Sequence, residues 1–298
     1  MADRKKIVIA DAMEKEVVEK LRSLGEVECQ PEDLKLALKE ADVLIVRSAT
    51  KVTADLIADA PRLKIVARAG VGLDNVDRMA CEGRGIRVIN TPGASTAAVA
   101  ELTIGLLICL LRNVGRAHAK MKTGEWDKKG CTGHEAAGKT LGLVGFGRIG
   151  RMVAEKASAL GMRVIYNDPK MVAGPYGHYK DIDQLVECAD IVSLHATTKN
   201  GGPALMDKER IGRMKRGAYL INTARGAMVD EAALADALES GHLAGAALDV
   251  YGKEPYEGPL REIDNVILTP HIGAGTYEAQ ERIGEDLIAQ LRQMLGKE

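Results

Sequence analysis

Short runs of β-branched and aliphatic residues alternate with amphipathic stretches along almost the whole chain, and this alternation constrains the fold more than any other feature. In the first third, the predicted strands are residues 6–10, 43–47, 64–68 and 87–90, and the clearest predicted helices between them are 12–24 and 53–60. Strands that alternate with helices form parallel sheets covered by helices. The first third therefore predicts a doubly wound α/β unit.

A second alternation begins at Leu141. Its predicted strands are residues 141–145, 163–167, 191–195, 218–222, 245–250 and 265–269, and its clearest helices are 148–160 and 231–240. A long predicted helix at 97–112 and a polar, weakly periodic stretch at 112–140 separate the two alternations. A chain of 298 residues is too long for one small core. We therefore predict two α/β domains, each a doubly wound parallel sheet.

A final helix is predicted at 277–295. One stripe of this helix carries the apolar side chains Ile283, Leu287, Leu291 and Leu295. We expect the helix to fold back onto the first domain.

Composition and charge exclude several classes of function. Lys and Arg (41) nearly balance Asp and Glu (42), so neither nucleic acid nor an acidic membrane surface is indicated as a partner. The apolar run 102–111 is too short to span a bilayer, and the first 16 residues show no signal-peptide pattern. The five cysteines form no CxxC pair, which suits a reducing cytoplasm. No metal site is predicted, because Gly138 stands where an HExxH motif starting at His134 needs its second histidine.

The segment GLVGFGRIG places a glycine pattern between a predicted strand and a predicted helix. The candidate residues of this turn are Gly145, Gly147, Arg148, Ile149 and Gly150. The first glycine permits the tight turn, the second lets the backbone approach a pyrophosphate at the helix N-terminus, and the third lets the helix pack closely. Asp168 ends the next strand, where a carboxylate binds ribose hydroxyls and repels a 2′-phosphate. The pattern predicts an NAD site. Lys170 is a weak signal for NADP, and a turn without any ligand is the structural alternative.

The segment GHEAAGKT, at 133–140, formally matches the phosphate loop of many nucleoside triphosphatases. That loop requires a strand before it and a helix after it. Here a polar stretch precedes the segment and a strand follows it, so no triphosphate site is predicted.

Three polar residues follow strands of the second alternation. Arg225 follows AYLINTA, Glu254 follows GAALDVYGK and His271 follows NVILTP. Ligands of doubly wound sheets bind beyond the carboxyl ends of the strands. There an arginine can hold a substrate carboxylate, a histidine can exchange the hydroxyl proton, and a carboxylate can fix the histidine tautomer. Taken singly, Arg225 also suits a surface ion pair, Glu254 a turn, and His271 a structural role.

Four segments resemble the D-isomer-specific 2-hydroxyacid dehydrogenases: AGKTLGLVGFGRIGR, LINTARGAMVDEAAL, GAALDVYGKEP and LTPHIGAGTYEAQ. The similarity extends over essentially the whole chain. It implies a Rossmann NAD domain at 97–274, with a dimerisation arm at about 112–139. This domain is inserted in a flavodoxin-like substrate domain at 1–96 plus 275–298. It also implies that Arg225, Glu254 and His271 are catalytic, with His271 as the acid/base.

The resemblance implies further contacts. The remaining candidates for the cofactor site are His195, Thr223, Ala224, Asp249, Gly273 and Ala274. Among them, Asp249 matches a family residue near the nicotinamide carboxamide. Val71 and Gly72 match a loop whose backbone N–H groups contact the substrate carboxylate.

The first domain resembles the 3-phosphoglycerate dehydrogenase branch in VRSATKVTADLI and IVARAGVGLDNVD. This likeness implies that Arg47 and Arg68 face the substrate and pair with a phosphate, and that Lys128 of the arm reaches a neighbouring subunit's site. A doubly charged substrate needs such groups, because Arg225 can hold only one of its ends. Each of the two arginines could instead pair with a local carboxylate.

Two segments depart from the branch. NTPGASTAAVAEL lacks an asparagine common near this helix start, and HATTKN replaces a more usual His-x-Pro-Leu-Thr. These departures concern substrate specificity rather than the reaction class. The printed chain ends at Glu298, after the returning helix, so we expect no serine inhibition through a C-terminal regulatory domain.

The sequence thus predicts a cytoplasmic, NAD-dependent oxidation of D-3-phosphoglycerate at the start of serine biosynthesis. A glyoxylate, hydroxypyruvate or other 2-ketoacid reductase is the nearest alternative, and an NADH-sensing regulatory protein is a further one. The arm and the apolar helix before it predict a homodimer or homotetramer.

Overall fold

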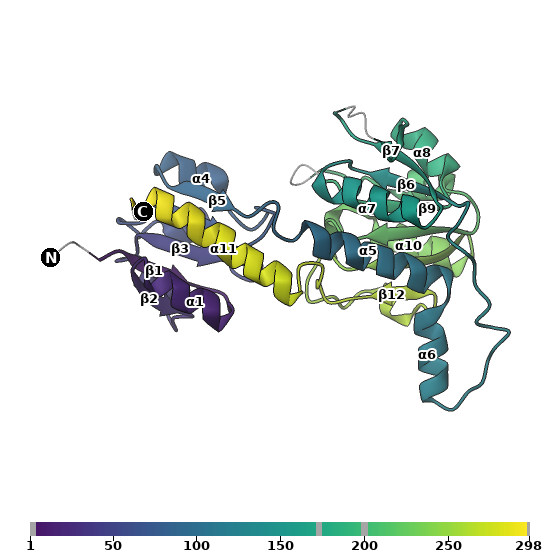
Figure 1. The fold of residues 1–298 in the computed structure, drawn as a ribbon, viewed down its shortest axis with the longest axis horizontal. Helices are drawn as coiled ribbons and strands as arrows, with labels where there is room; N and C mark the ends of the chain where they lie inside the picture. The colour runs from purple at the N-terminus through teal and green to yellow at the C-terminus, as the bar shows by residue number, and fades with distance from the viewer. Residues whose placement is uncertain (1–3, 171–174, 198–201, 297–298) are drawn as a thin grey trace. The chain divides into compact units, whose positions relative to one another are not determined.

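The computed structural model describes residues 4–170, 175–197 and 202–296 (Figure 1). Its contacts divide the chain into two compact units. Unit 1 comprises the chain up to Ser95 together with the segment from Ala274 onward, and unit 2 comprises Thr96–Gly273. Each unit has its own parallel sheet, so each is described by itself.

Unit 1 is built on a five-stranded parallel sheet in the order β2-β1-β3-β4-β5, which is the flavodoxin-like order. Its strands are β1 (Lys6–Ile9), β2 (Glu26–Cys29), β3 (Val43–Val46), β4 (Ile65–Arg68) and β5 (Arg87–Asn90). Alternate side chains of each central strand serve two cores. Val43 and Ile45 face one core, while Leu44 and Val46 face the other.

Helices cover both faces of this sheet. The helices α1 (Lys15–Arg22) and α11 (Tyr277–Met294) pack on one face, and Figure 1 shows α11 running beside α1. The apolar stripe of α11 supplies Ile283, Leu287 and Leu291 to this core. The other face is covered by the short helices α2 (Leu34–Leu38), α3 (Ala54–Ile57) and α4 (Arg78–Gly83).

Unit 2 is built on a seven-stranded parallel sheet in the order β12-β11-β10-β9-β6-β7-β8. Its strands are β6 (Thr140–Val144), β7 (Arg163–Asn167), β8 (His178–Tyr179), β9 (Ile191–Leu194), β10 (Ala218–Asn222), β11 (Leu243–Leu248) and β12 (Val266–Leu268). The chain winds outward from β6 in one direction and from β9 in the other. The direction of winding therefore changes between β6 and β9, which is where such sheets bind ligands.

The helices α5 (Thr96–Leu111) and α7 (Arg148–Ala159) pack on one face of this sheet. The other face is covered by α8 (Ile182–Cys188), α9 (Lys208–Arg213) and α10 (Glu231–Glu239). The short 3₁₀ helix η1 (Gly226–Met228) follows β10, and a second one, η2 (Pro259–Glu262), precedes β12. The predicted α/β fold with two parallel sheets is confirmed.

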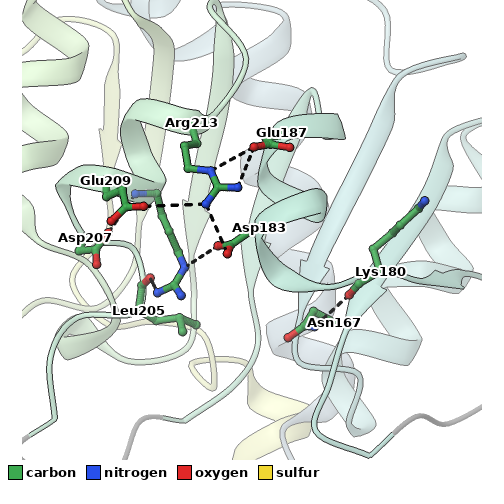
Figure 2. Close-up of polar contacts among 9 residues, drawn as sticks. Asn167, Lys180, Asp183, Glu187, Leu205, Asp207, Glu209 and Arg213 are labelled. Carbon is green, nitrogen blue, oxygen red and sulfur yellow. Dashed lines mark hydrogen bonds and ion pairs between the residues drawn. The ribbon is translucent and has the colours of Figure 1, made fainter.

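An ion-pair network ties α8 to α9 on the outside of unit 2 (Figure 2). The Arg213 guanidinium lies 2.8 Å from Glu187 and 3.3 Å from Asp183, and Arg210 lies 3.2 Å from Asp183. These side chains are partly exposed, so the network contributes little stability for each pair.

Several elements were not predicted from the pattern. The stretch at 112–140 contains a helix, α6 (Val114–Lys122), which Figure 1 shows standing away from the rest of unit 2. It has no buried residue, so it lacks the apolar stripe on which the prediction depended. The edge strands β2 and β8 were likewise not predicted, because neither contains a buried residue. The strand predicted at 245–250 begins and ends two residues earlier, at Leu243–Leu248.

A test of length and apolar composition identifies no single membrane-spanning helix among the described residues. Only the pair of α5 and α6, bent by 67° at a short break, passes this test jointly.

Candidate active site

The glycine turn lies at the carboxyl end of β6, beside the point where the winding direction changes. Gly145 has φ +99°, and a Cβ there would lie 2.6 Å from the His195 backbone. A Cβ at Gly150 would lie 2.2 Å from the Gly145 carbonyl oxygen, so α7 packs tightly on the turn. Nothing lies within 4 Å of the position of a Cβ at Gly147, so the backbone is open to a ligand. This arrangement fits a dinucleotide pyrophosphate.

Asp168 stands at the end of β7, next to the glycine turn. Its Oδ2 accepts a hydrogen bond from the backbone N–H of Phe146 at 2.7 Å, and its Oδ1 accepts one from the backbone N–H of Lys170 at 2.9 Å. These bonds hold the carboxylate in place and leave lone pairs for further donors. Its place on the strand beside the turn is the one that binds ribose hydroxyls in such folds.

His195 follows β9, on the opposite side of the glycine turn from Asp168. Its Nε2 lies 2.9 Å from the Ser193 Oγ, and its Nδ1 is buried without a hydrogen-bond partner among the described residues. Burial lowers the pKa of His195 to about 3. The ring is therefore neutral at physiological pH, which suits contact with a cofactor better than the binding of an anion.

The loop after β10 carries Arg225. Asn222, fully buried at the end of the strand, accepts a bond from the Ala224 N–H at 3.1 Å and donates to the Arg225 carbonyl at 2.9 Å. The Arg225 guanidinium donates to the Ala224 carbonyl at 2.6 Å. The loop is thus closed by hydrogen bonds within itself, with Arg225 half-buried.

Glu254 and His271 form a direct pair. The His271 Nδ1 lies 2.8 Å from the Glu254 Oε2, and the two side chains are 42% and 37% exposed. The pair comes from the loops after β11, which neighbours β10 in the sheet, and β12, which neighbours β11. The carboxylate fixes the proton on Nδ1 and leaves Nε2 for a ligand. The three predicted catalytic residues thus follow three adjacent strands, and two of them touch.

His271 has φ +54°, which is unusual for a residue other than glycine. The neighbouring backbone is held by Asp249, whose side chain is 1% exposed. Its carboxylate accepts bonds from the N–H groups of Ile272 and Gly273 at 2.8 Å and from the Thr269 hydroxyl at 2.7 Å. Asp249 therefore shapes the loop that presents His271.

Two more predicted cofactor residues lie at this edge of unit 2. Thr223 is buried and its hydroxyl lies 2.9 Å from the Thr103 hydroxyl of α5. Ala224, also buried, follows it before Arg225. Ala274 belongs to unit 1, where its carbonyl accepts a bond from Gln280 at 2.7 Å.

The predicted substrate-binding residues of unit 1 lie at the carboxyl edge of its own sheet. Arg47 follows β3, and its guanidinium donates to the Ala12 carbonyl at 3.0 Å. Arg68 ends β4 and packs against Gly70, where a Cβ would lie 1.6 Å from the guanidinium.

Val71 and Gly72 follow Arg68 in the same loop. The Val71 carbonyl accepts a bond from the Asn90 amide at 2.6 Å, which fastens the loop to β5. The two residues are half-buried, and their backbone lies at the edge where ligands bind in such sheets.

Lys128 is exposed in the arm that follows α6. Its neighbour Asp127 pairs with Lys120 at 2.7 Å, and this pair links the arm to α6. The hydrogen bond from Lys120 holds the pKa of Asp127 below its usual range.

Sequence reasoning missed the buried polar residues that support these loops. They are Ser193, Asn222 and Tyr251. A usable signal exists for the first two, because a small polar residue within an apolar strand needs a buried partner. Among the described residues, no group of three His, Cys, Asp or Glu side chains is placed to hold a metal ion.

Comparison with known proteins agrees with this geometry. The family model of the D-isomer specific 2-hydroxyacid dehydrogenase NAD binding domain matches residues 104–273. A hydroxypyruvate reductase of Thermotoga maritima is 43% identical over 98% of this chain and 99% of that protein. A D-3-phosphoglycerate dehydrogenase of Methanocaldococcus jannaschii is 44% identical over 97% of this chain, which spans only 57% of that relative.

A solved structure agrees as well. The D-lactate dehydrogenase of Aquifex aeolicus, complexed with NAD and lactic acid, superposes with a TM-score of 0.87 at 30% identity. The match covers 98% of this chain and 96% of that one. The predicted fold is confirmed, and so is the NAD cofactor that the glycine turn predicted.

Proposed function

Because this chain belongs to the D-isomer specific 2-hydroxyacid dehydrogenase family, we propose that Arg225, Glu254 and His271 catalyse its NAD-dependent reaction on a small 2-hydroxy or 2-keto acid. The observation that carries the proposal is the 2.8 Å contact between His271 Nδ1 and Glu254 Oε2. It lies beyond the carboxyl ends of the strands, in the sheet that bears the NAD-binding turn.

His271 moves the proton. With Nδ1 bonded to Glu254, the Nε2 atom faces the substrate oxygen and exchanges a proton with it. Glu254 keeps the tautomer fixed and balances the charge of the imidazolium. Bound NAD supplies the hydride acceptor, and NADH the donor, at the substrate carbon.

Arg225 anchors the substrate. Its planar guanidinium can bind a carboxylate through two parallel hydrogen bonds, which orients the adjacent carbonyl. The hydrogen bonds of Asn222 within the same loop keep this arginine in place before the substrate binds. Such preorganisation lowers the cost of reaching the reactive geometry.

The finer assignment is D-3-phosphoglycerate oxidised to 3-phosphohydroxypyruvate, the opening step of serine biosynthesis. Support comes from Arg47 and Arg68, which lie at the carboxyl edge of the unit 1 sheet. Two guanidinium groups suit a phosphate, and Lys128 of the arm adds a positive charge to the site of a neighbouring subunit. We further propose a cytoplasmic location, in keeping with the free cysteines of the described chain.

Unphosphorylated hydroxypyruvate is the second candidate substrate. The observation that favours it is the match to the Thermotoga maritima hydroxypyruvate reductase along 99% of that protein's length. The catalytic residues serve either substrate, since phosphohydroxypyruvate and hydroxypyruvate both carry a carboxylate beside a ketone carbonyl.

A substrate panel tests the proposal. Purified protein and NADH are mixed with phosphohydroxypyruvate, hydroxypyruvate, glyoxylate and pyruvate, and NADH oxidation is followed at 340 nm. We expect turnover of at least one ketoacid, with the highest kcat/KM for the phosphorylated one. No turnover of any of the four would contradict the proposed reaction, while a preference for hydroxypyruvate would select the second candidate.

We also propose that the arm joins two copies of the chain. The arm region exposes large apolar side chains, with Trp126 79% and Met121 55% exposed. Exposed apolar groups on a projecting segment are typical of an interface. Light scattering should report a dimer or tetramer, and Trp126→Ser should shift the equilibrium toward monomer.

A further inference from the structure

Tyr251 lies between the loops that carry the three candidate catalytic residues. It is 9% exposed and follows β11 by three residues. Neither its hydroxyl nor its backbone belongs to the set that contacts substrate in the proposed reaction. Its contacts nevertheless reach all three loops.

The hydroxyl joins two strand ends. The Tyr251 Oη lies 2.9 Å from the Leu248 carbonyl at the end of β11 and 2.8 Å from the Thr269 carbonyl just after β12. A phenol has one proton, so it donates to either carbonyl or is shared between them. Thr269 is two residues before His271, so this hydroxyl fastens the beginning of the histidine loop.

The backbone of Tyr251 touches the other two loops. Its N–H donates to the Glu254 Oε1 at 3.2 Å, while the other carboxylate oxygen faces His271. On the opposite side Gly226, which follows Arg225, packs against the Tyr251 carbonyl. A Cβ at Gly226 would lie 1.8 Å from that carbonyl carbon.

We propose that the Tyr251 hydroxyl is a positioning group that holds the His271 loop in register with Glu254. The inference rests on the proposed catalytic roles of these two residues and deepens them. Without the hydroxyl, the carbonyls of Leu248 and Thr269 lose their shared donor, and the end of β12 is held by the Thr269 N–H bond to the Leu248 carbonyl at 3.0 Å and by Asp249. The histidine then samples orientations in which its Nε2 is displaced from the substrate oxygen.

Two features keep this group in its role. The Tyr251 ring stacks on Tyr256 with centroids 4.4 Å apart, which limits its rotation. Burial and the nearby Asp249 carboxylate raise the pKa of Tyr251 to about 12. The phenol therefore remains a hydrogen-bond donor near neutral pH.

The test compares Tyr251→Phe with Tyr256→Phe in the full-length protein. Both variants remove one hydroxyl and keep the ring stack, but the Tyr256 hydroxyl accepts from the Leu260 N–H and does not contact β12. For Tyr251→Phe we expect kcat to fall on the order of tenfold. The Kd for NADH, measured by fluorescence, should stay within about twofold, and Tyr256→Phe should keep a normal kcat.

Hydrogen exchange gives a readout that does not depend on activity. Peptides covering 269–273 should exchange faster in Tyr251→Phe than in the wild type or in Tyr256→Phe, because the bond from the Tyr251 hydroxyl to the Thr269 carbonyl is lost. Unchanged exchange in this segment would overturn the inference, as would an equal loss of kcat in both variants.

A second substitution separates this inference from the proposed function. Introduced into His271→Asn, Tyr251→Phe should change the residual rate by less than about twofold, because the group it positions is gone. A full tenfold loss in that background would contradict the positioning role. If His271→Asn itself keeps wild-type turnover, the proposed function fails; if it is impaired while Tyr251→Phe is normal, only the present inference fails.

Discussion

The two units are both parallel sheets covered by helices, yet they place their buried carboxylates at opposite edges. In unit 1, Asp42 is 2% exposed at the start of β3, where it accepts from the Lys6 N–H at 3.0 Å and contacts Arg62 at 3.3 Å. In unit 2, Asp249 is 1% exposed just after β11 and binds the backbone of the His271 loop.

The difference shows how similar architecture serves different ends. A buried carboxylate at the amino ends of the strands neutralises basic side chains and binds a backbone N–H of the neighbouring strand. A buried carboxylate at the carboxyl edge shapes a loop where ligands bind. At the carboxyl edge of unit 2 Asp249 binds the backbone of the loop that carries His271, whereas the corresponding edge of unit 1 presents the guanidinium groups for which we propose substrate recognition.

The largest effect is expected at the histidine of the unit 2 edge. His271→Asn keeps a side chain of similar size but removes the proton donor, so kcat should fall by about 10² to 10⁴. The Kd for NADH should be unchanged. His134→Asn, an exposed histidine of the same unit, is the matched control and should keep normal kcat. A wild-type kcat for His271→Asn would show that His271 is not the acid/base of the reaction.

A paired substitution tests the comparison of the two edges. Asp249→Asn loses one acceptor for the His271 loop, so kcat should fall on the order of tenfold. Asp42→Asn leaves Arg62, and Lys5 whose Nζ lies 3.4 Å from Asp42, without their buried counter-charge, so it should cost about 1–3 kcal/mol of unfolding free energy while kcat stays normal. Steady-state kinetics and urea denaturation of both variants check this. If Asp42→Asn lowers kcat as much as Asp249→Asn, the two edges do not differ in the way described.

The cofactor side of unit 2 should respond less. Asp168→Ala removes the acceptor for the ribose hydroxyls and the repulsion of a 2′-phosphate, so the ratio of kcat/KM for NADH over NADPH should fall by about tenfold. Fixed ketoacid and varied cofactor give this ratio. A ratio equal to that of the wild type would show that Asp168 does not select the cofactor.

The smallest effect concerns His195 and pH. Its pKa in the folded protein is about 3, below the ordinary value of 6.5, so the unfolded chain binds a proton between these values while the folded chain does not. This group therefore lowers stability progressively as pH falls below about 6.5, by up to roughly 1.4 kcal/mol per unit. His195→Gln should show a weaker loss between pH 7 and 5.5 in thermal unfolding. An NMR titration of the His195 ring with a midpoint near 6.5 would disprove the assignment.

Strongly periodic segments made the fold predictable. Most strands of both sheets were placed within about two residues, because fully buried strands read as continuous apolar runs. The helix α6 and the edge strands β2 and β8 carry little burial and therefore little pattern. The order of strands in space, by contrast, comes from tertiary pairing that no local segment encodes.

The candidate site was predictable only in part. Residue type and position after a strand selected Arg225, Glu254 and His271 without any knowledge of their contacts. The supporting bonds of Asp249 and Tyr251 join segments about 20 residues apart, and their register depends on how β11 and β12 pair. A tyrosine that closely follows an apolar strand looks like an ordinary core residue, so its hydroxyl gave no signal.

The central claim is that unit 2 performs the chemistry while unit 1 selects the substrate. The most direct test compares variants of unit 1 on two substrates. Arg47→Gln and Arg68→Gln are assayed for kcat/KM with phosphohydroxypyruvate and hydroxypyruvate at saturating NADH. Lys35→Gln serves as the control, because it removes an exposed charge of the same unit. We expect a loss of about 10- to 100-fold in kcat/KM for the phosphorylated substrate alone, the value of a charge-assisted phosphate contact. An equal loss for both substrates, or none for either, would contradict it.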